Sequence, residues 1–285
     1  SIFSKKQNNI ITPHIIKTVK ALNCNRNELG ELNTFKKNSW YNEIITNAKL
    51  YNNVKIIMTQ YLNFNLSNLF KKKIPNEQLS IIFFQICYTL VCIQNNLVEF
   101  RHNDLKPTNI FYTYEKNKEK YHDIYLIMGI KFYIPCLPFT IKIADFDFCN
   151  SKLFKNQKVH TFKDTTFYKK GITPEINPVY DIHYFINTSL SLIKNEKNRK
   201  YLLKFISLDT LGKTNKYTNS FRLTSYHIDN KYNYIPKDML SPAQILLKHF
   251  NKFKNKPSKL LIRNFYNSNV NLNNIKERKD MFNII

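Results

Sequence analysis

Glycine is scarce in this chain. Only four of its 285 residues are glycine, and Gly30 is the single one within residues 1–62. Because glycine has no Cβ, a glycine-rich loop lets backbone amides approach a phosphate closely. No G-x-G-x-x-G pattern occurs in the sequence. A phosphate-binding loop of that pattern is therefore excluded within the printed residues.

Cysteine pairs and long apolar runs are also missing. The five cysteines are scattered without a C-x-x-C pair, which argues against a disulfide framework and predicts reduced thiols in a cytosolic setting. The longest apolar stretch, 79–93, contains Gln85 and is too short to cross a bilayer. The first residues lack the pattern of a signal peptide. We therefore expect neither a transmembrane segment nor a secretory leader.

Acidic residues are few, with 20 Asp and Glu against 44 Lys and Arg, and the formal net charge is +24. Such a charge suits a polyanion, a membrane surface or acidic substrates. Lys, Asn, Ile, Tyr and Phe are all abundant, however. An AT-rich genome produces this composition whatever the function of the protein. The lysines are spread along the chain without an aromatic-basic motif, so no specific nucleic-acid partner is predicted. The aromatic content of 14% predicts a folded globule.

Two polar strings stand out against this background. They are FRHNDLKPTNI (100–110) and IKIADFDFC (141–149). Asp104 can accept the proton of an attacking hydroxyl, and Lys106 can lie against a transferred phosphate. Asn109 and Asp145 supply oxygen ligands of the kind that Mg²⁺ prefers. These residue types in this order predict a phosphoryl-transfer site.

The surrounding segments predict how these strings are held. Residues 76–96 are apolar with helical spacing and predict a buried helix that leads into the first string. Residues 139–145 alternate like a strand that ends at Asp145. Between the strings, two strand-like runs flank Gly129 and predict an inserted β-hairpin. Near the C-terminus, Ser241 precedes Pro242 and predicts the N-cap of a helix over 241–253.

The two strings resemble the protein-kinase catalytic loop, H-R-D-L-x-x-x-N, and its metal-binding D-F-G segment. The Asp-Leu-Lys-Pro order resembles the serine/threonine branch. With the hairpin and VYDIHYFINTSL (179–190), the chain resembles serine/threonine kinases of large cytoplasmic DNA viruses, most closely those of poxvirus virions. The resemblance covers residues 12–254.

This resemblance implies an α+β, bilobal, protein-kinase-like fold. The expected domains are a small β-rich N-lobe over 1–62, complete or truncated, and a larger, mainly helical C-lobe over 63–254. A basic, Asn-rich tail follows over 255–285. It would dock on a lobe, bind a partner or be loosely ordered.

The resemblance also implies an activity. A serine/threonine protein kinase transfers the γ-phosphate of ATP, with Mg²⁺ or Mn²⁺, to hydroxyls of protein substrates. Asp104 would be the catalytic base and Lys106 would neutralise the transferred group, while Asn109 and Asp145 would hold the metal. Kinases of this viral kind imply a role in virion assembly, located in the virion and the host cytoplasm.

The expected N-lobe supplies the remaining nucleotide contacts. Residues 10–22 alternate like a strand, and HIIK resembles the V-A-I-K strand, so Lys17 is the preferred phosphate-binding lysine and Lys20 its competitor. The helical pattern over 36–52 offers Glu43 as the partner of that lysine, or as a solvated acid. The missing glycine-rich loop either lies upstream of Ser1 or is degenerate.

A further strand is expected over 53–62, buried and leading into the hinge between the lobes. Thr59 would then be the gatekeeper beside the adenine. The backbone from Gln60 to Leu62 would contact the adenine itself.

The resemblance has departures with chemical consequences. Asn103 replaces the Arg of H-R-D, which in kinases binds a phosphate on the activation loop. Asp147 replaces the Gly of D-F-G and has less backbone freedom. Asp181 matches the acid that holds the catalytic-loop backbone, and Glu175 matches the A-P-E glutamate less well. The histidines, His102 and His183, are expected to be structural.

Two alternatives remain open at this stage. A pseudokinase scaffold, binding virion or host proteins without turnover, is favoured by the missing glycine-rich loop. A small-molecule kinase shares the H-x-D-x-x-x-x-N loop but is disfavoured by the Lys106-Pro107 pair and the long segment over 150–175.

Overall fold

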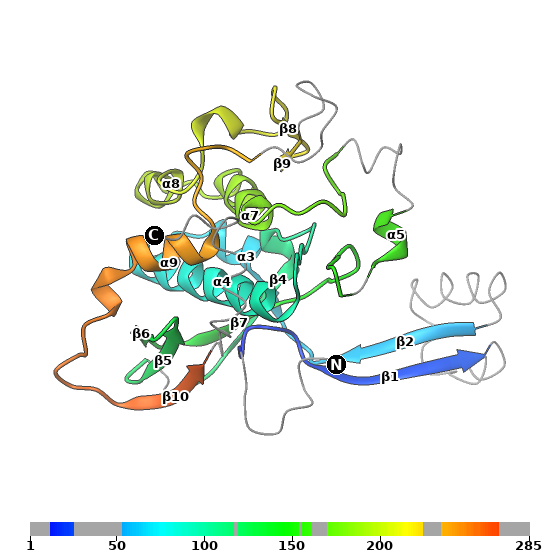
Figure 1. Cartoon of the computed structure of the whole chain (residues 1–285). Helices are drawn as coiled ribbons and strands as arrows, with labels where there is room; N and C mark the ends of the chain where they lie inside the picture. Colours follow the sequence, from blue (N-terminus) through cyan, green and yellow to red (C-terminus); the bar gives the residue numbers. More distant parts are fainter. Residues whose placement is uncertain are drawn as a thin grey trace. The chain divides into compact units, whose positions relative to one another are not determined.

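The computed structural model describes residues 12–25, 53–116, 119–153, 155–160, 170–224 and 235–267. These residues form a mixed α+β structure with several small sheets (Figure 1). They divide into two compact units. The described residues 16–25 and 53–61 belong to the first unit, and residues 12–15 and 62–267 belong to the second.

The described part of the first unit is an antiparallel pair of strands. Strand β1 (Thr18–Asn25) pairs with β2 (Asn53–Thr59), from Thr18 opposite Thr59 to Asn25 opposite Asn53. The predicted strand over 10–22 was therefore placed too early, because residues 12–17 form only an isolated bridge at Ile15. Proline at position 13 lacks the N–H that a strand ladder needs, which explains the later start.

The second predicted strand of this region is confirmed in type but not in extent. Strand β2 ends at Thr59 rather than at residue 62, and residues 58–61 are exposed, so the prediction of a buried strand is wrong at this end. The helix expected over 36–52, with Glu43, lies outside the described residues.

The core of the second unit is built around helix α4 (Asn76–Asn96). Its residues from Leu79 to Gln94 are buried without a polar face, as expected of a helix surrounded by protein. The helix begins and ends where the apolar pattern predicted. By length and composition α4 would also suit a membrane span, but 83% of its apolar window is buried inside the fold.

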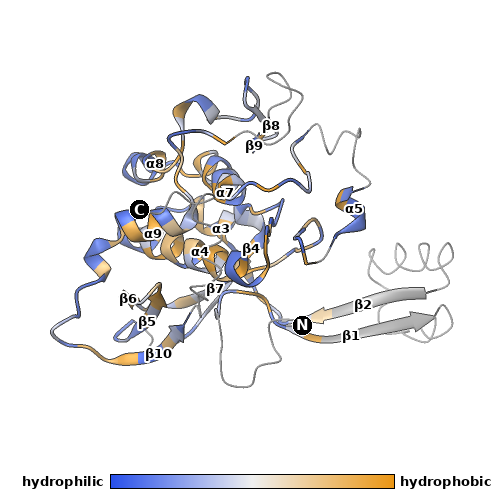
Figure 2. Cartoon of the chain, in the orientation of Figure 1, coloured by the Kyte–Doolittle hydropathy of each residue, from blue (hydrophilic) through white to orange (hydrophobic). Residues whose placement is uncertain are grey.

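Further helices pack around α4. Helix α7 (Tyr180–Leu190) is buried along its whole length, and α9 (Pro242–His249) lies beside α4. Figure 2 shows apolar residues along α4 and α9, whereas α8 (Glu196–Leu203) is largely hydrophilic. The predicted N-cap Ser241 is confirmed, because its hydroxyl accepts a hydrogen bond from the Gln244 N–H in a capping box. The remaining short helices are α3 (Leu66–Phe70), η2 (Pro107–Asn109), α5 (Gln157–His160), η3 (Leu208–Thr210) and η4 (Asn251–Phe253).

Three small sheets complete the described part of the second unit. Strand β4 (Ile110–Tyr114) lies between β3 (Phe64–Asn65) and β7 (Phe139–Ile143), and both pairings are antiparallel. The predicted hairpin is confirmed: β5 (His122–Ile127) and β6 (Ile130–Pro135) pair around a turn at Met128 and Gly129. A short hairpin, β8 (Thr218–Asn219) and β9 (Arg222–Leu223), turns at Ser220 and Phe221.

Part of the C-terminal tail joins the inserted hairpin. Strand β10 (Ile262–Asn267) pairs in parallel with β5, so this part of the tail docks on the second unit (Figure 1). The Arg263 guanidinium donates to both carboxylate oxygens of Asp123 at 3.1 and 3.2 Å and to Glu115 at 3.1 Å. Planar, two-bond pairs of this kind are stronger than single contacts. Arg263 therefore fixes β10 against β5.

Replacing Arg263 tests this anchor. Arg263→Met leaves the Asp123 carboxylate, whose side chain is 6% exposed, without its cation. We expect the free energy of unfolding to fall by about 2 kcal/mol, measured by thermal unfolding. Lys259→Met, at an exposed position on the same tail, is the control and should have almost no effect. An equal loss in the two variants would contradict the anchor.

Candidate active site

Helix α7 holds the backbone of the loop that follows α4. The Asp181 carboxylate accepts hydrogen bonds from the backbone N–H groups of His102 at 2.8 Å and Asn103 at 3.0 Å. Complete burial raises the pKa of Asp181 above its ordinary value, while the neighbouring His102 and the two N–H bonds act in the opposite direction. The prediction that Asp181 holds the backbone of this loop is confirmed.

Two of the predicted loop residues, Lys106 and Asn109, donate hydrogen bonds to the Asp104 carboxylate. The Lys106 ammonium donates to Oδ2 at 2.8 Å, and the Asn109 side-chain amide donates to the same oxygen at 2.9 Å. The Asn109 amide also donates to the Asp104 carbonyl at 3.0 Å. The Asp104 side chain is only 5% exposed, whereas that of Lys106 is 35% exposed. Three of the predicted residues thus form one hydrogen-bonded group.

Two side chains that sequence analysis missed occupy the other carboxylate oxygen. The Arg222 guanidinium, from β9, forms an ion pair with Oδ1 of Asp104. The Tyr184 hydroxyl, from α7, lies 3.5 Å from the same oxygen. Arg222 lies outside every motif in the sequence, and Tyr184 lies in the segment that was matched through Asp181, where the tyrosine itself carried no expected role. Only the folded chain brings them to the loop.

Asp145 lies next to this group. The Ala144 N–H donates to the Asn109 carbonyl at 3.0 Å, and the His102 ring donates through Nε2 to the Ala144 carbonyl at 3.1 Å. Asp145 follows directly, two residues beyond the end of β7, and its side chain is exposed. Both hydrogen bonds fix the backbone immediately before the predicted metal ligand.

Asn109 and Asp145 are the residues that would hold a magnesium ion at this site. The amide nitrogen of Asn109 is committed to Asp104, and its Oδ1 accepts one long hydrogen bond, from the Thr108 hydroxyl at 3.4 Å. A second lone pair of Oδ1 is therefore the site at which Asn109 could hold a ligand. Within the described part of the chain, no ion pair involves Asp145. A carboxylate and a carboxamide oxygen are hard ligands, as Mg²⁺ prefers. No group of three or more His, Cys, Asp or Glu side chains among the described residues offers a competing metal site.

Two non-glycine residues of the site have left-handed backbone conformations. Asn103 has φ 64° and Asp145 has φ 62°. Asn and Asp tolerate this region better than other residues, at a small cost. Asp147, in the glycine position of D-F-G, does not need this conformation, and its carbonyl accepts a hydrogen bond from Asn156 at 2.8 Å. The fold therefore accommodates the Asp147 replacement.

Asn103 joins the two ends of the segment that follows β7. Its side-chain amide donates to the Phe148 carbonyl at 2.9 Å and to the Thr173 carbonyl at 3.2 Å. These are neutral bonds that involve no phosphate. Asn103 thus holds both ends of the segment in place of the charge-assisted contact that an arginine would make.

Arg101 supports the same segment from within the core. Its fully buried guanidinium donates to the Thr173 hydroxyl and to the carbonyls of Glu175 and Gly171, at 2.8 to 3.0 Å. It also lies 3.7 Å from the centre of the Tyr180 ring. Arg101, although adjacent in sequence to the loop, therefore does not take over the position of the missing H-R-D arginine.

The remaining predicted residues are not brought to this group by the described structure. Lys17 and Gln60 belong to the first unit, where the Gln60 N–H donates to the Lys17 carbonyl at 3.0 Å. Leu62 belongs to the second unit. Glu43 lies outside the described residues. Their roles, and the choice between Lys17 and Lys20, stay predictions.

Both histidines have the structural role that was expected. The Nδ1 atom of His102 accepts from the Asp104 N–H at 3.3 Å, so its ring is bonded to backbone on both sides. His183 is buried and contacts the Thr210 carbonyl through Nε2 at 3.1 Å. Burial lowers the pKa of His183 to about 3, so this ring stays neutral at physiological pH.

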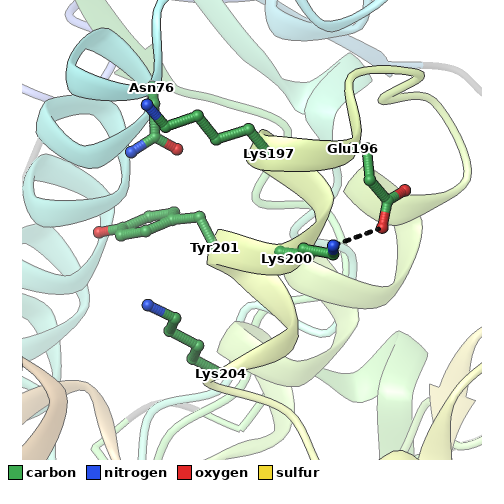
Figure 3. Close-up of a pocket in the computed structure, with 6 residues that line it drawn as sticks. All are labelled: Asn76, Glu196, Lys197, Lys200, Tyr201 and Lys204. Carbon is green, nitrogen blue, oxygen red and sulfur yellow. Dashed lines mark ion pairs between the residues drawn. The ribbon is translucent and has the colours of Figure 1, made fainter.

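A separate cavity of about 410 Å³ lies between α8 and the start of α4. Figure 3 shows Lys197 and Lys204 on either side of the Tyr201 ring, with Lys200 turned toward Glu196. None of the predicted site residues lines it. Its lysines would suit an anion. The ion pair between Lys200 and Glu196 is exposed and contributes little to stability.

Comparison with known proteins gives two similar chains. A stretch of 119 residues, 40% of this chain, is 37% identical to the "Putative serine/threonine-protein kinase R400" of Acanthamoeba polyphaga mimivirus. Over 304 aligned positions, covering 84% of this chain, it is 23% identical to the "Putative serine/threonine-protein kinase R301" of the same virus. The matches span a quarter of R400 and about three quarters of R301. No family model matches the chain. The chain is thus similar to proteins named as kinases of a giant virus.

Gly171 provides a test of how closely the end of the segment after β7 packs against β9. A Cβ at this position would lie 2.5 Å from the Leu223 carbonyl oxygen, and its φ of +84° is unfavourable for other residues. Gly129 has a similar φ of +79° but open space around it. We expect Gly129→Ala to cost about 1–2 kcal/mol of stability. Gly171→Ala should cost about 1–3 kcal/mol more, because backbone must move. Equal losses in urea unfolding would contradict the close approach of Gly171 to β9.

Proposed function

We propose that this chain is a serine/threonine protein kinase that transfers the γ-phosphate of ATP to protein hydroxyls. The observation that supports this most is the connected group of Asp104, Lys106 and Asn109, joined through the Asn109 carbonyl to the residue before Asp145. A base, a cation and two metal ligands then meet at one end of the β4–β7 pair. This is the arrangement that phosphoryl transfer needs.

Each residue has a defined role in this mechanism. Asp104 accepts the hydrogen bond, and then the proton, of the substrate hydroxyl. Lys106 is the more exposed member of the pair, so it can turn from Asp104 to the transferred phosphoryl group. Asn109 and Asp145 would hold Mg²⁺, or Mn²⁺, and the ion would supply positive charge to offset that of the ATP phosphates. The rate enhancement comes from positioning and electrostatics rather than from a covalent intermediate.

The expected N-lobe over residues 1–62 would supply the nucleotide contacts. In this proposal Lys17 binds the α- and β-phosphates, Glu43 orients it, and the backbone from Gln60 to Leu62 meets the adenine. Together with a C-lobe over residues 63–254 this N-lobe would make a bilobal kinase, followed by the tail over 255–285. The chain's similarity to the mimivirus proteins supports a viral origin.

The biological setting is part of the proposal. By resemblance to poxvirus virion kinases, the enzyme would act in virion assembly, in the virion and the host cytoplasm, on proteins that present Ser or Thr. The net charge of +24 would favour acidic substrates or a membrane surface.

A pseudokinase scaffold is the second candidate. It is favoured by the absence of a G-x-G-x-x-G pattern, which would otherwise hold the phosphates through backbone amides. It is opposed by the intact set of Asp104, Lys106, Asn109 and Asp145. A binder of nucleotide should show a metal-dependent rise in melting temperature with ATP, whether or not it turns over.

The function is tested by radiolabelled phosphate transfer from ATP to acidic and basic protein substrates. Asp104→Asn should lower the rate by about a hundredfold or more, because the base is lost, and should leave the ATP-dependent melting shift intact. Asp145→Ala should remove both the activity and the Mg²⁺ dependence of that shift. Asp238→Asn, at an exposed position, is the matched control. Turnover retained in Asp104→Asn would refute the assignment.

Activity should not depend on phosphorylation of the segment after β7. Because Asn103 holds both ends of that segment through neutral bonds, Thr161→Ala, Thr165→Ala and Thr166→Ala should keep most of the activity. These threonines lie outside the described residues. Phosphatase treatment of the unaltered protein is the control. A loss above about tenfold, the worth of one charge-assisted hydrogen bond, would contradict the prediction.

A further inference from the structure

The Asp104 carboxylate has no free acceptor position in the described structure. Lys106 and Asn109 donate to Oδ2, while Arg222 and Tyr184 lie on Oδ1. An ionised carboxylate has about four lone-pair sites, two on each oxygen. A substrate hydroxyl can therefore reach Asp104 only when one of these four donors leaves.

Lys106 and Arg222 differ in how firmly they are held. The Lys106 side chain is 35% exposed, and Asp104 is its one ion-pair partner among the described residues. The Arg222 side chain is 9% exposed. Its guanidinium lies 4.0 Å from the centre of the Tyr184 ring, and its Nε donates to the Asn103 carbonyl at 3.3 Å. Arg222 thus has two anchors that do not involve Asp104.

The hairpin that carries Arg222 is itself fixed to α7. The buried Asn187 side chain donates to the carbonyls of Phe221 at 3.1 Å and Gly212 at 2.9 Å, and its oxygen accepts from the Gly212 N–H at 3.0 Å. The turn residues, Ser220 and Phe221, have φ values of 52° and 68°. Such values are unfavourable for a bulky residue and persist only where the surroundings enforce them. The position of Arg222 is therefore set by α7, which also holds the loop backbone through Asp181.

We propose that Arg222 is a positioning residue for Asp104. It fixes Oδ1, so that Oδ2 faces the substrate hydroxyl once Lys106 has turned to the phosphate. It then remains as the counter-charge of the buried carboxylate. This inference rests on the kinase function proposed above, because it assigns the two oxygens of the same base to different tasks.

The first test is kinetic and uses the full chain. Arg222→Met should lower kcat by about tenfold to a hundredfold, because the base loses its fixed orientation, and should change the KM for ATP little. Arg222→Lys should restore part of kcat, since it keeps the charge but not the planar fork. Rates are expressed per folded molecule.

Arg199→Met is the matched control for this test. Arg199 is also a partly buried arginine, but among the described residues it donates to the carbonyls of Leu190, at the end of α7, and Ile193, just beyond it. Its replacement should lower stability without lowering kcat. A kcat for Arg222→Met that is unchanged or raised overturns the proposal, and a raised value would make Arg222 a restraint on the base instead.

The second test does not require activity. In urea unfolding, Arg222→Met should destabilise the protein more in the presence of Asp104 than in the Asp104→Asn background, because the two groups interact directly. Additive effects would overturn the proposed contact. If the unaltered protein neither transfers phosphate nor responds to Mg·ATP, the kinase function fails. The double-mutant cycle still decides whether Arg222 holds Asp104.

Discussion

The two hydrogen bonds between Asp181 and the backbone of His102 and Asn103 position everything else at this site. Asp181 is a buried carboxylate at the start of α7, and an unpaired charge there would be costly. The loop amides satisfy that charge, and in doing so they take a fixed place relative to the core. Asp104, Lys106 and Asn109 then project from a backbone that has little freedom to move.

The structure also shows how a kinase-like loop is held without the arginine of H-R-D. Neutral amide bonds from Asn103 and a buried guanidinium at Arg101 connect the loop to both ends of the following segment. A contact to a phosphate is made when one residue is phosphorylated and lost when the phosphate is removed. Bonds to backbone and hydroxyl groups of this kind are present once the chain has folded and do not depend on a phosphate, so the arrangement favours constitutive order over switching.

Local patterns predicted the elements that local forces determine. The bounds of α4 followed from its apolar residues, and the hairpin at Gly129 followed from two strand-like runs around a turn. The group of Asp104, Lys106 and Asn109 followed from motif spacing. The start of β1 was misplaced, because alternation over 10–17 is also compatible with a chain that is held by other contacts. His14, for example, is buried and bonded to the Ile141 carbonyl at 3.1 Å and to Tyr125 at 2.9 Å.

Arg222 and β10 show what such patterns could not supply. Arg222 is separated from Asp104 by 118 residues and β10 from β5 by about 140, and neither segment carries a motif that names its partner. The contacts depend on the assembled helices between them. The sequence did not decide whether the tail docks on a lobe, binds a partner or is loosely ordered. In the structure, residues 262–267 are docked on β5.

The parallel pairing of β5 with β10 has a consequence for how the protein is made. A nascent chain emerges from its N-terminus, so the β5–β6 hairpin is complete long before Ile262 is synthesised. Contacts between segments so distant in sequence form slowly, because a long loop must close first. Until then β5 presents an open edge, the feature through which partly made chains associate wrongly. Pairing of β10 with β5 therefore closes an edge that stays open while the chain between them is being synthesised.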